Sequence, residues 1–143
     1  MRILSIFGYI GMVGGLLYLV WTRNFFALSP LVLVTQTAGV CMVLWARFTL
    51  GKRSFHVMAN PTAGALVMSG PYRRIRHPLY LGFCLFTLAG IAAHFSLRTA
   101  ICGAFIAGCV VLRIFCEESL VTQQYPEYQE YAARTWRLVP FVF

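Results

Sequence analysis

Long apolar stretches dominate the chain and alternate with short polar segments. Four stretches hold few charged side chains, at residues 3–21, 28–50, 79–95 and 97–116. Each is close to the roughly 20 residues that an α-helix needs to cross a hydrocarbon core of about 30 Å. The pattern therefore predicts an all-α fold: an integral membrane bundle of about four transmembrane helices.

The connections between these stretches predict two further features. The third and fourth stretches are separated only at HFSLR, residues 94–98, so we expect them to form a tight antiparallel hairpin. After the fourth stretch, Pro126 is expected to start a short C-terminal helix with Glu127 in its first turn. Its aromatic residues suit an interfacial helix lying on the membrane, and they are Tyr128, Tyr131 and Trp136.

Composition supports a multi-pass membrane protein of one domain. The 143 residues are 59% hydrophobic and 11% charged, whereas a soluble domain carries roughly 25% charged residues. We expect one domain over residues 1–143, with two N-terminal spans within residues 1–50. The sequence YLVWTRN at the end of the first stretch lacks a small-x-small cleavage site, which favours a retained span over a signal peptide.

The net charge of +8 is distributed unevenly. With four spans and both termini on the cytoplasmic side, only Arg23 and Arg98 lie outside. The other basic residues lie inside: Arg2, Arg47, Lys52, Arg53, Arg73, Arg74, Arg76, Arg113, Arg134 and Arg137. This positive-inside bias accounts for the basicity without a nucleic-acid partner. Arg73 and Arg74 are expected to contact the anionic headgroups of membrane lipids.

Small residues within the stretches are interpreted as packing residues. Cys102, Cys109 and Cys116 repeat every seven residues and share one helix face, with no CxxC or Cys/His pair that would indicate a metal site or a disulfide framework. Gly11 and Gly15 form a GxxxG pair. Such a pair brings helices close together, and a homodimer through the first stretch is one alternative that it leaves open.

A cluster of basic and aromatic residues precedes the third stretch, in GPYRRIRHPLYLG, residues 70–82. Gly-Pro at residues 70–71 indicates a turn, and Pro78 suits the first position of a helix. The helix N-terminus, with its unsatisfied N–H groups, would then lie beside His77, Arg76 and Tyr72. This arrangement is typical of an anion site.

The acidic residues are equally concentrated. The chain has four glutamates and no aspartate, and two of the glutamates are adjacent in RIFCEESL, residues 113–120. Arg113 and Glu117 are four residues apart and share a helix face. A hairpin of the third and fourth stretches would bring Arg113, Glu117 and Glu118 to the cluster around His77. We expect a site with donors on one rim and acceptors on the other, suited to a ligand with one carboxylate and one ammonium group.

Three segments together carry a family resemblance: LVMSGPYRRIRHPLYLG, RIFCEESL and YPEYQEYAARTWRLVP. They resemble the isoprenylcysteine carboxyl methyltransferase family, whose signature phospholipid N-methyltransferases share. The resemblance covers about residues 66–140, which would form the catalytic core. It implies an integral membrane enzyme that binds S-adenosylmethionine at the cytoplasmic face and methylates a lipophilic acceptor. Pro126 departs from the pattern, because relatives often have glycine there.

The resemblance also implies roles for particular residues. Arg113 matches a position that faces the acceptor, which makes it the candidate catalytic residue. The residues expected to bind or flank the cofactor are Leu66, Val67, Tyr72, Arg76, His77, Pro78, Leu79, Tyr80, Glu117 and Glu118. The C-terminal helix would be either a lid over the cofactor or a membrane anchor.

Methyl transfer is an in-line displacement, so alignment and exclusion of water supply most of the catalysis. A carboxylate acceptor needs only an orienting cation such as Arg113, whereas an amine or thiol would need a base, Glu118 or His77. The acceptor stays open between prenylated cysteine, a phospholipid amine, an isoprenoid-like lipid and a small thiol. The alternatives are a phospholipid N-methyltransferase, a membrane reductase with a nicotinamide cofactor, and a small four-span transporter. The transporter is disfavoured because the chain has no carboxylate in the middle of a span.

Overall fold

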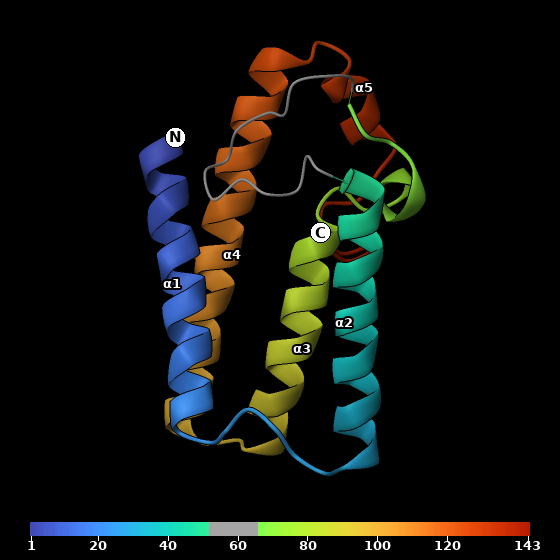
Figure 1. The fold of residues 1–143 in the computed structure, drawn as a ribbon. Helices are drawn as coiled ribbons and strands as arrows, with labels where there is room; N and C mark the ends of the chain where they lie inside the picture. The colour runs from blue at the N-terminus through green and yellow to red at the C-terminus, as the bar shows by residue number, and fades with distance from the viewer. Residues whose placement is uncertain (52–65) are drawn as a thin grey trace.

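The computed structural model describes residues 1–51 and 66–143, so Lys52 and Arg53 lie outside the described residues. The described residues form helices and no strand, which confirms the all-α prediction (Figure 1). The elements in chain order are α1 (Arg2–Trp21), α2 (Pro30–Leu50), the 3-10 helix η2 (Gly70–Arg73), α3 (Pro78–Ala93), α4 (Leu97–Gln124) and α5 (Tyr128–Ala133).

The helix ends follow local chemistry. Ser96 caps α4, accepting a hydrogen bond from the Thr99 N–H at 3.2 Å, while the Ser96 N–H donates to Thr99 Oγ1 at 2.9 Å. At its other end α4 continues beyond the predicted limit at residue 116, because the next helix breaker is Pro126. The residue before a proline is restricted to extended conformations, and Tyr125 has φ −122° and ψ 100°.

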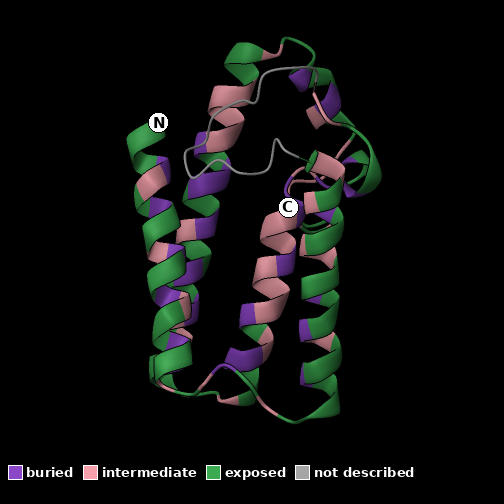
Figure 2. Cartoon of the chain, in the orientation of Figure 1, coloured by how far each residue is buried: buried purple, intermediate pink, exposed green. Residues whose placement is uncertain are grey.

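Three helices, α1, α2 and α4, are long and apolar enough to cross a membrane. The third predicted span corresponds to α3, which has 16 residues. This length corresponds to about 24 Å of helix. Helix α3 is thus a shorter apolar helix than the three candidate spans. Many large apolar side chains are exposed, such as those of Phe7, Leu31 and Phe105. Figure 2 shows exposed positions along the outside of the helices. Such an apolar exterior is consistent with a bundle that lies in lipid.

The helices associate as two pairs, α1 with α4 and α2 with α3 (Figure 1). The turn between α3 and α4 is short and the two helices are antiparallel, as predicted, but α3 packs mainly against α2 rather than against α4. The physical reason is a close backbone approach between Gly39 and Gly82. A Cβ added to Gly39 would lie 2.7 Å from the Gly82 carbonyl oxygen, and a Cβ on Gly82 would lie 2.6 Å from the Gly39 carbonyl oxygen.

Small residues also bring α1 against α4. A Cβ added to Gly11 would lie 2.5 Å from Cys109 Sγ, and one added to Gly15 would lie 2.5 Å from Ile106 Cγ1. Cys102 Sγ lies 3.6 Å from the Gly15 carbonyl oxygen. The prediction that these cysteines are packing residues is therefore confirmed for Cys102 and Cys109. The GxxxG pair faces α4 within the chain, and a homodimer through α1 stays a prediction.

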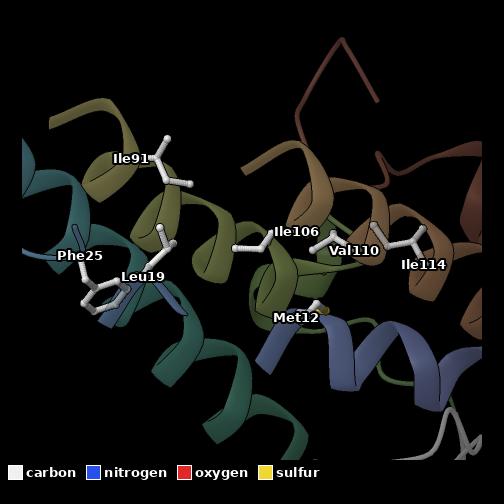
Figure 3. Packing of buried hydrophobic residues seen from close by; sticks show 7 residues of the cluster. All are labelled: Met12, Leu19, Phe25, Ile91, Ile106, Val110 and Ile114. Atoms are coloured by element: carbon white, nitrogen blue, oxygen red, sulfur yellow. The ribbon is translucent and has the colours of Figure 1, made fainter. Parts of the chain in front are cut away.

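A cluster of buried apolar side chains runs along the two helix pairs. Its members are Met12, Leu19, Phe25, Ile91, Ile106, Val110 and Ile114 (Figure 3). Phe25 follows α1, and its ring packs on Phe86 of α3 at 4.8 Å between centroids. The buried Gln36 side chain of α2 donates a hydrogen bond to the Phe25 carbonyl oxygen at 2.8 Å. These contacts connect the two helix pairs at the end of the bundle that carries the α3–α4 turn.

The C-terminal segment differs from the prediction in how it packs. Helix α5 begins at Tyr128, close to the expected start, but both Tyr128 and Tyr131 are buried in the protein. These two rings therefore pack against the protein, and the interfacial position of the helix stays a prediction. Tyr131 donates a hydrogen bond from its hydroxyl to the Tyr72 carbonyl oxygen at 2.6 Å, and this buried partner explains why the ring turns inward.

Candidate active site

The segment that leads into α3 starts at a glycine that the backbone requires. Gly70 has a φ of +56°, and a Cβ there would lie 2.6 Å from Thr49 Oγ1 of α2. The chain then forms η2 and reaches His77 at the N-cap and Pro78 at the first position of α3. The predicted turn and helix start are both confirmed. The segment of residues 70–77 therefore lies over the end of the α2–α3 pair.

Glu117 of α4 meets α3 at this end of the bundle. The Tyr80 hydroxyl donates to Glu117 Oε1, and Arg113 Nε lies 3.2 Å from the same oxygen. Arg113 Nε also donates to the Tyr80 hydroxyl. His77 Nδ1 lies 3.6 Å from the other oxygen, Glu117 Oε2. The i,i+4 pair of Arg113 and Glu117 is thus present, and it is part of a network that joins two helices.

Glu118, the next residue of α4, is surrounded by three cationic or titratable side chains. Its Oε1 lies 3.0 Å from Arg76 Nε and 3.4 Å from His77 Nε2, and its Oε2 accepts a hydrogen bond from Arg137 Nε at 2.9 Å. The Glu118 side chain is 12% exposed. Arg76 and His77 precede α3, whereas Arg137 belongs to the C-terminal segment. Both oxygens of Glu118 are therefore occupied by contacts from two distant parts of the chain.

His77 lies between the two carboxylates. Burial lowers the pKa of His77, but hydrogen bonds and charge interactions with Glu117 and Glu118 outweigh burial and hold the pKa above its ordinary value. The ring also stacks on Tyr80, with 5.7 Å between the ring centroids. This environment favours an imidazolium with one ring nitrogen facing each carboxylate.

Arg113 is enclosed by residues of α1. Its side chain is 5% exposed, and Nη1 donates to the Ser5 carbonyl oxygen at 3.1 Å. The guanidinium carbon lies 5.1 Å from the centre of the Tyr9 ring. The Ser5 hydroxyl is buried and has no hydrogen-bond partner among the described residues. Ser5 and Tyr9 are not among the residues predicted from the sequence. The one signal that could have identified Ser5 is a lone aliphatic hydroxyl near the start of an apolar stretch.

Tyr72 places a second unpaired hydroxyl in this region. The side chain is buried, and its hydroxyl has no hydrogen-bond partner among the residues that the structure describes. Burial, with smaller effects from Tyr131 and Glu117, raises the pKa of Tyr72 well above its ordinary value. The phenol therefore remains a neutral hydrogen-bond donor. An unpaired buried donor is unfavourable, and a ligand acceptor would satisfy it.

The remaining predicted residues are apolar. Pro78 is buried and Leu79 half-buried in the first turn of α3, and Leu66 and Val67 are half-buried in the segment that leads to η2. The network brings together six predicted residues, namely Arg76, His77, Tyr80, Arg113, Glu117 and Glu118. Within the described ranges no group of His, Cys, Asp or Glu side chains could hold a metal ion.

A bundle of apolar helices with a polar network at one end defines a membrane protein with one candidate site. The model of the isoprenylcysteine carboxyl methyltransferase family matches residues 25–123 of this chain. The chain therefore belongs to the isoprenylcysteine carboxyl methyltransferase family, which is a family of membrane methyltransferases. The matched range contains Glu117, Glu118, Arg113 and the segment of residues 72–80. No curated protein and no solved structure matches the chain.

Proposed function

We propose that this protein is an S-adenosylmethionine-dependent methyltransferase that acts on a lipophilic acceptor with a carboxylate, as an isoprenylcysteine carboxyl methyltransferase does. The observation that carries the proposal is the joint arrangement of Glu117, His77, Tyr80 and the unpaired Tyr72 hydroxyl at one end of an apolar bundle. The family match supports the methyltransferase class.

The residues present fit the cofactor. S-adenosylmethionine carries an ammonium group, a carboxylate, ribose hydroxyls and an adenine. Glu117 is 23% exposed, and its Oε2 makes only a long contact, 3.6 Å, to His77, so it can accept from an ammonium or a ribose hydroxyl. The Tyr72 hydroxyl can donate to the cofactor. His77 Nδ1, whose contact with Glu117 is long, can donate to it as well. We expect the half-buried Leu66 and Val67 to supply apolar surface to the cofactor.

The two glutamates would then have different roles. Glu118 is about half as exposed as Glu117, and its oxygens are held by Arg76, His77 and Arg137. We assign cofactor binding to Glu117. Glu118 holds the surrounding cations in place, which neutralises charge that burial would otherwise make costly.

The catalytic contribution of the protein is alignment and exclusion of water. When bound, S-adenosylmethionine supplies a methyl group activated by a sulfonium. Tyr72, His77 and Glu117 would fix the cofactor, and Arg113 would orient the acceptor carboxylate. Arg113 is enclosed between α1, α3 and α4, so an acceptor must reach it from the apolar interior of the bundle. A lipophilic acceptor meets this requirement.

The protonation of His77 favours an acceptor that is already an anion. A raised pKa keeps His77 in the imidazolium form, in which it cannot take a proton from an amine or a thiol. A carboxylate is ionised at neutral pH and needs no base. This supports transfer to a carboxylate oxygen oriented by Arg113.

The distribution of cations supports a cytoplasmic site. The end of the bundle that carries the network also carries the exposed Arg73 and Arg74, whereas Arg23 and Arg98 lie near the α3–α4 turn at the opposite end. In Figure 1 the N-terminus also lies toward the network end. By the positive-inside bias, we propose that the site and both termini face the cytoplasm.

The test is calorimetric binding of S-adenosylhomocysteine to the detergent-purified protein. Tyr72→Phe is the most informative variant, because it removes a hydroxyl that has no partner among the described residues and should leave the thermal unfolding temperature unchanged or slightly higher. We expect the wild type to bind and both Tyr72→Phe and Glu117→Gln to bind more weakly.

The matched control is Glu130→Gln, because Glu130 forms an exposed pair with Arg134 away from the network. It should bind like the wild type. Absence of binding to the folded wild type would refute the cofactor assignment, and binding of NADPH in its place would support the reductase alternative. For the acceptor, a prenylated cysteine analogue and labelled methyl donor should give turnover that Arg113→Ala abolishes. Near-normal turnover in that variant would exclude the orienting role.

A further inference from the structure

The C-terminal segment, residues 125–143, is joined to the segment that carries His77 by backbone hydrogen bonds. The Arg76 N–H donates to the Trp136 carbonyl oxygen at 2.8 Å, and the His77 N–H donates to the Arg137 carbonyl oxygen at 3.0 Å. The Trp136 N–H donates to the Arg74 carbonyl oxygen at 3.0 Å. Figure 1 shows the two segments side by side beyond the end of α3. The C-terminal segment therefore holds the residues that precede α3 directly.

Two side-chain hydrogen bonds add to these backbone contacts between the two segments. The Tyr131 hydroxyl donates to the Tyr72 carbonyl oxygen at 2.6 Å, and Arg76 Nη1 donates to the Ala132 carbonyl oxygen at 2.7 Å. Both tyrosines are buried. Burial raises the pKa of Tyr131 to about 12, which keeps its hydroxyl a donor. These contacts place α5 against the protein near the candidate site, an arrangement that a simple membrane anchor does not require.

Arg137 is the one cation of this segment that reaches a carboxylate of α4. Its Nε donates to Glu118 Oε2 at 2.9 Å. Its guanidinium carbon lies 5.1 Å from the centre of the Phe115 ring and 5.2 Å from that of Phe143. The side chain is 34% exposed. The two rings and the hydrogen bond together restrict the planar guanidinium to one orientation.

We propose that Arg137 is a positioning residue, which holds Glu118 and through it the Arg76 and His77 side chains at the mouth of the cofactor site. The C-terminal segment is then part of the site. This inference rests on the proposed function for its reference to a cofactor. Arg137 lies in the third segment that carries the family resemblance, but the resemblance implies no role for it, and it lies beyond the range of residues 25–123 that the family model matches.

The proposal has an electrostatic consequence that packing alone does not have. The charged and titratable groups around His77 are Glu117 and Glu118 of α4, Arg76 beside it and Tyr80 of α3. Replacement of Arg137 by glutamine removes a cation from Glu118 and makes the potential at His77 more negative. The imidazolium is then favoured further. Replacement by lysine retains the charge but loses the planar geometry.

The first experiment therefore needs no ligand. It measures the titration of His77 by NMR in full-length, histidine-labelled protein in detergent, for the wild type, Arg137→Gln, Arg137→Lys and Arg134→Gln. Arg134 is a matched control, because it lies three residues away and, among the described residues, pairs with the exposed Glu130 rather than with Glu118. We expect an upward shift of the His77 pKa in Arg137→Gln, and no shift in the lysine or the Arg134 variant. Identical titration of His77 in the wild type and Arg137→Gln would overturn the proposal.

The second experiment measures binding of S-adenosylhomocysteine to the same variants. Arg137→Gln should bind roughly tenfold more weakly, a size expected when a hydrogen bond to a charged group is lost. Arg134→Gln should bind like the wild type. If Arg137→Gln does not fold, the lysine variant decides: it should keep the His77 titration and bind severalfold more weakly, and wild-type affinity there would overturn the proposal. If the wild type itself binds no cofactor, the proposed function fails, while the His77 titration still tests Arg137.

Discussion

Replacement of Gly82 by alanine tests whether the packing of α2 on α3 sets the position of the site. The added methyl group would lie 2.6 Å from the Gly39 carbonyl oxygen and 3.0 Å from the Val43 backbone nitrogen. Ordinary contact begins near 3.4 Å. A third neighbour, Val43 Cγ2 at 2.7 Å, belongs to a side chain, but rotation of that side chain cannot relieve the two backbone contacts. The helices must therefore separate by about 0.8 Å.

The expected cost follows from the overpacking of a close contact, about 1–3 kcal/mol. Alanine also favours the helix over glycine by up to about 1 kcal/mol, and this gain must be removed from the comparison. Gly14→Ala provides the control, because a Cβ at Gly14 has no atom within 4 Å among the described neighbours. The difference in free energy of unfolding between the two variants, measured by circular dichroism during denaturation in mixed micelles, isolates the steric term.

Tyr80 lies two residues from Gly82, so the same shift should disturb the network. A displacement of this order at a catalytic site costs as much as a hundredfold in rate. We expect Gly82→Ala to be less stable than Gly14→Ala by about 1–3 kcal/mol and to bind S-adenosylhomocysteine more weakly. Equal unfolding free energies for the two variants would refute the close backbone approach of α2 and α3.

Two further substitutions test the network and the second helix pair. Glu118→Gln should lower the free energy of unfolding by about 3 kcal/mol, because it leaves the buried Arg76 and the partly buried Arg137 without this carboxylate and leaves His77 with Glu117 alone. Glu130→Gln, in an exposed pair, should change it by less than about 1 kcal/mol. Equal effects in chemical denaturation would contradict the central position of Glu118. Gly11→Ala should destabilise the α1–α4 contact, because the new methyl group would meet Cys109 Sγ. A second change, Cys109→Ala, removes that sulfur and should restore part of the lost stability. A double variant no more stable than Gly11→Ala would show that the two residues are not in contact.

Features that depend on a few neighbouring residues could be predicted from the sequence. The start of α3 at Pro78 follows from the restricted φ of proline and its missing N–H. The contact of Arg113 with Glu117 follows from helix geometry alone. The meeting of this pair with Tyr80 and His77 followed from the short α3–α4 turn, since antiparallel helices joined by three residues have their other ends on the same side.

The partner of α3 could not be predicted, because the helices are apolar on nearly every side and their pattern indicates no preferred face. The pairing is decided by glycines on different helices, Gly39 and Gly82, which are unremarkable in the sequence until they are seen in contact. The inward orientation of Tyr131 was also inaccessible, because its partner is a backbone carbonyl more than fifty residues away. The contact of Arg137 with Glu118 could have been suspected from one feature of the sequence. Two adjacent glutamates at the end of an apolar helix need several cations nearby.

The network that we assign to catalysis also joins the two helix pairs. At the end of the bundle near the α3–α4 turn, the pairs are held by apolar contacts such as that between Phe25 and Phe86. At the other end they are held by Tyr80 of α3, which contacts both Arg113 and Glu117 of α4. A ligand that competes for Glu117 must therefore also change how the pairs are joined. Cofactor binding and the spacing of α3 and α4 should be coupled for this reason, and a lipophilic acceptor that enters the bundle would meet Arg113 at the point where that spacing is set.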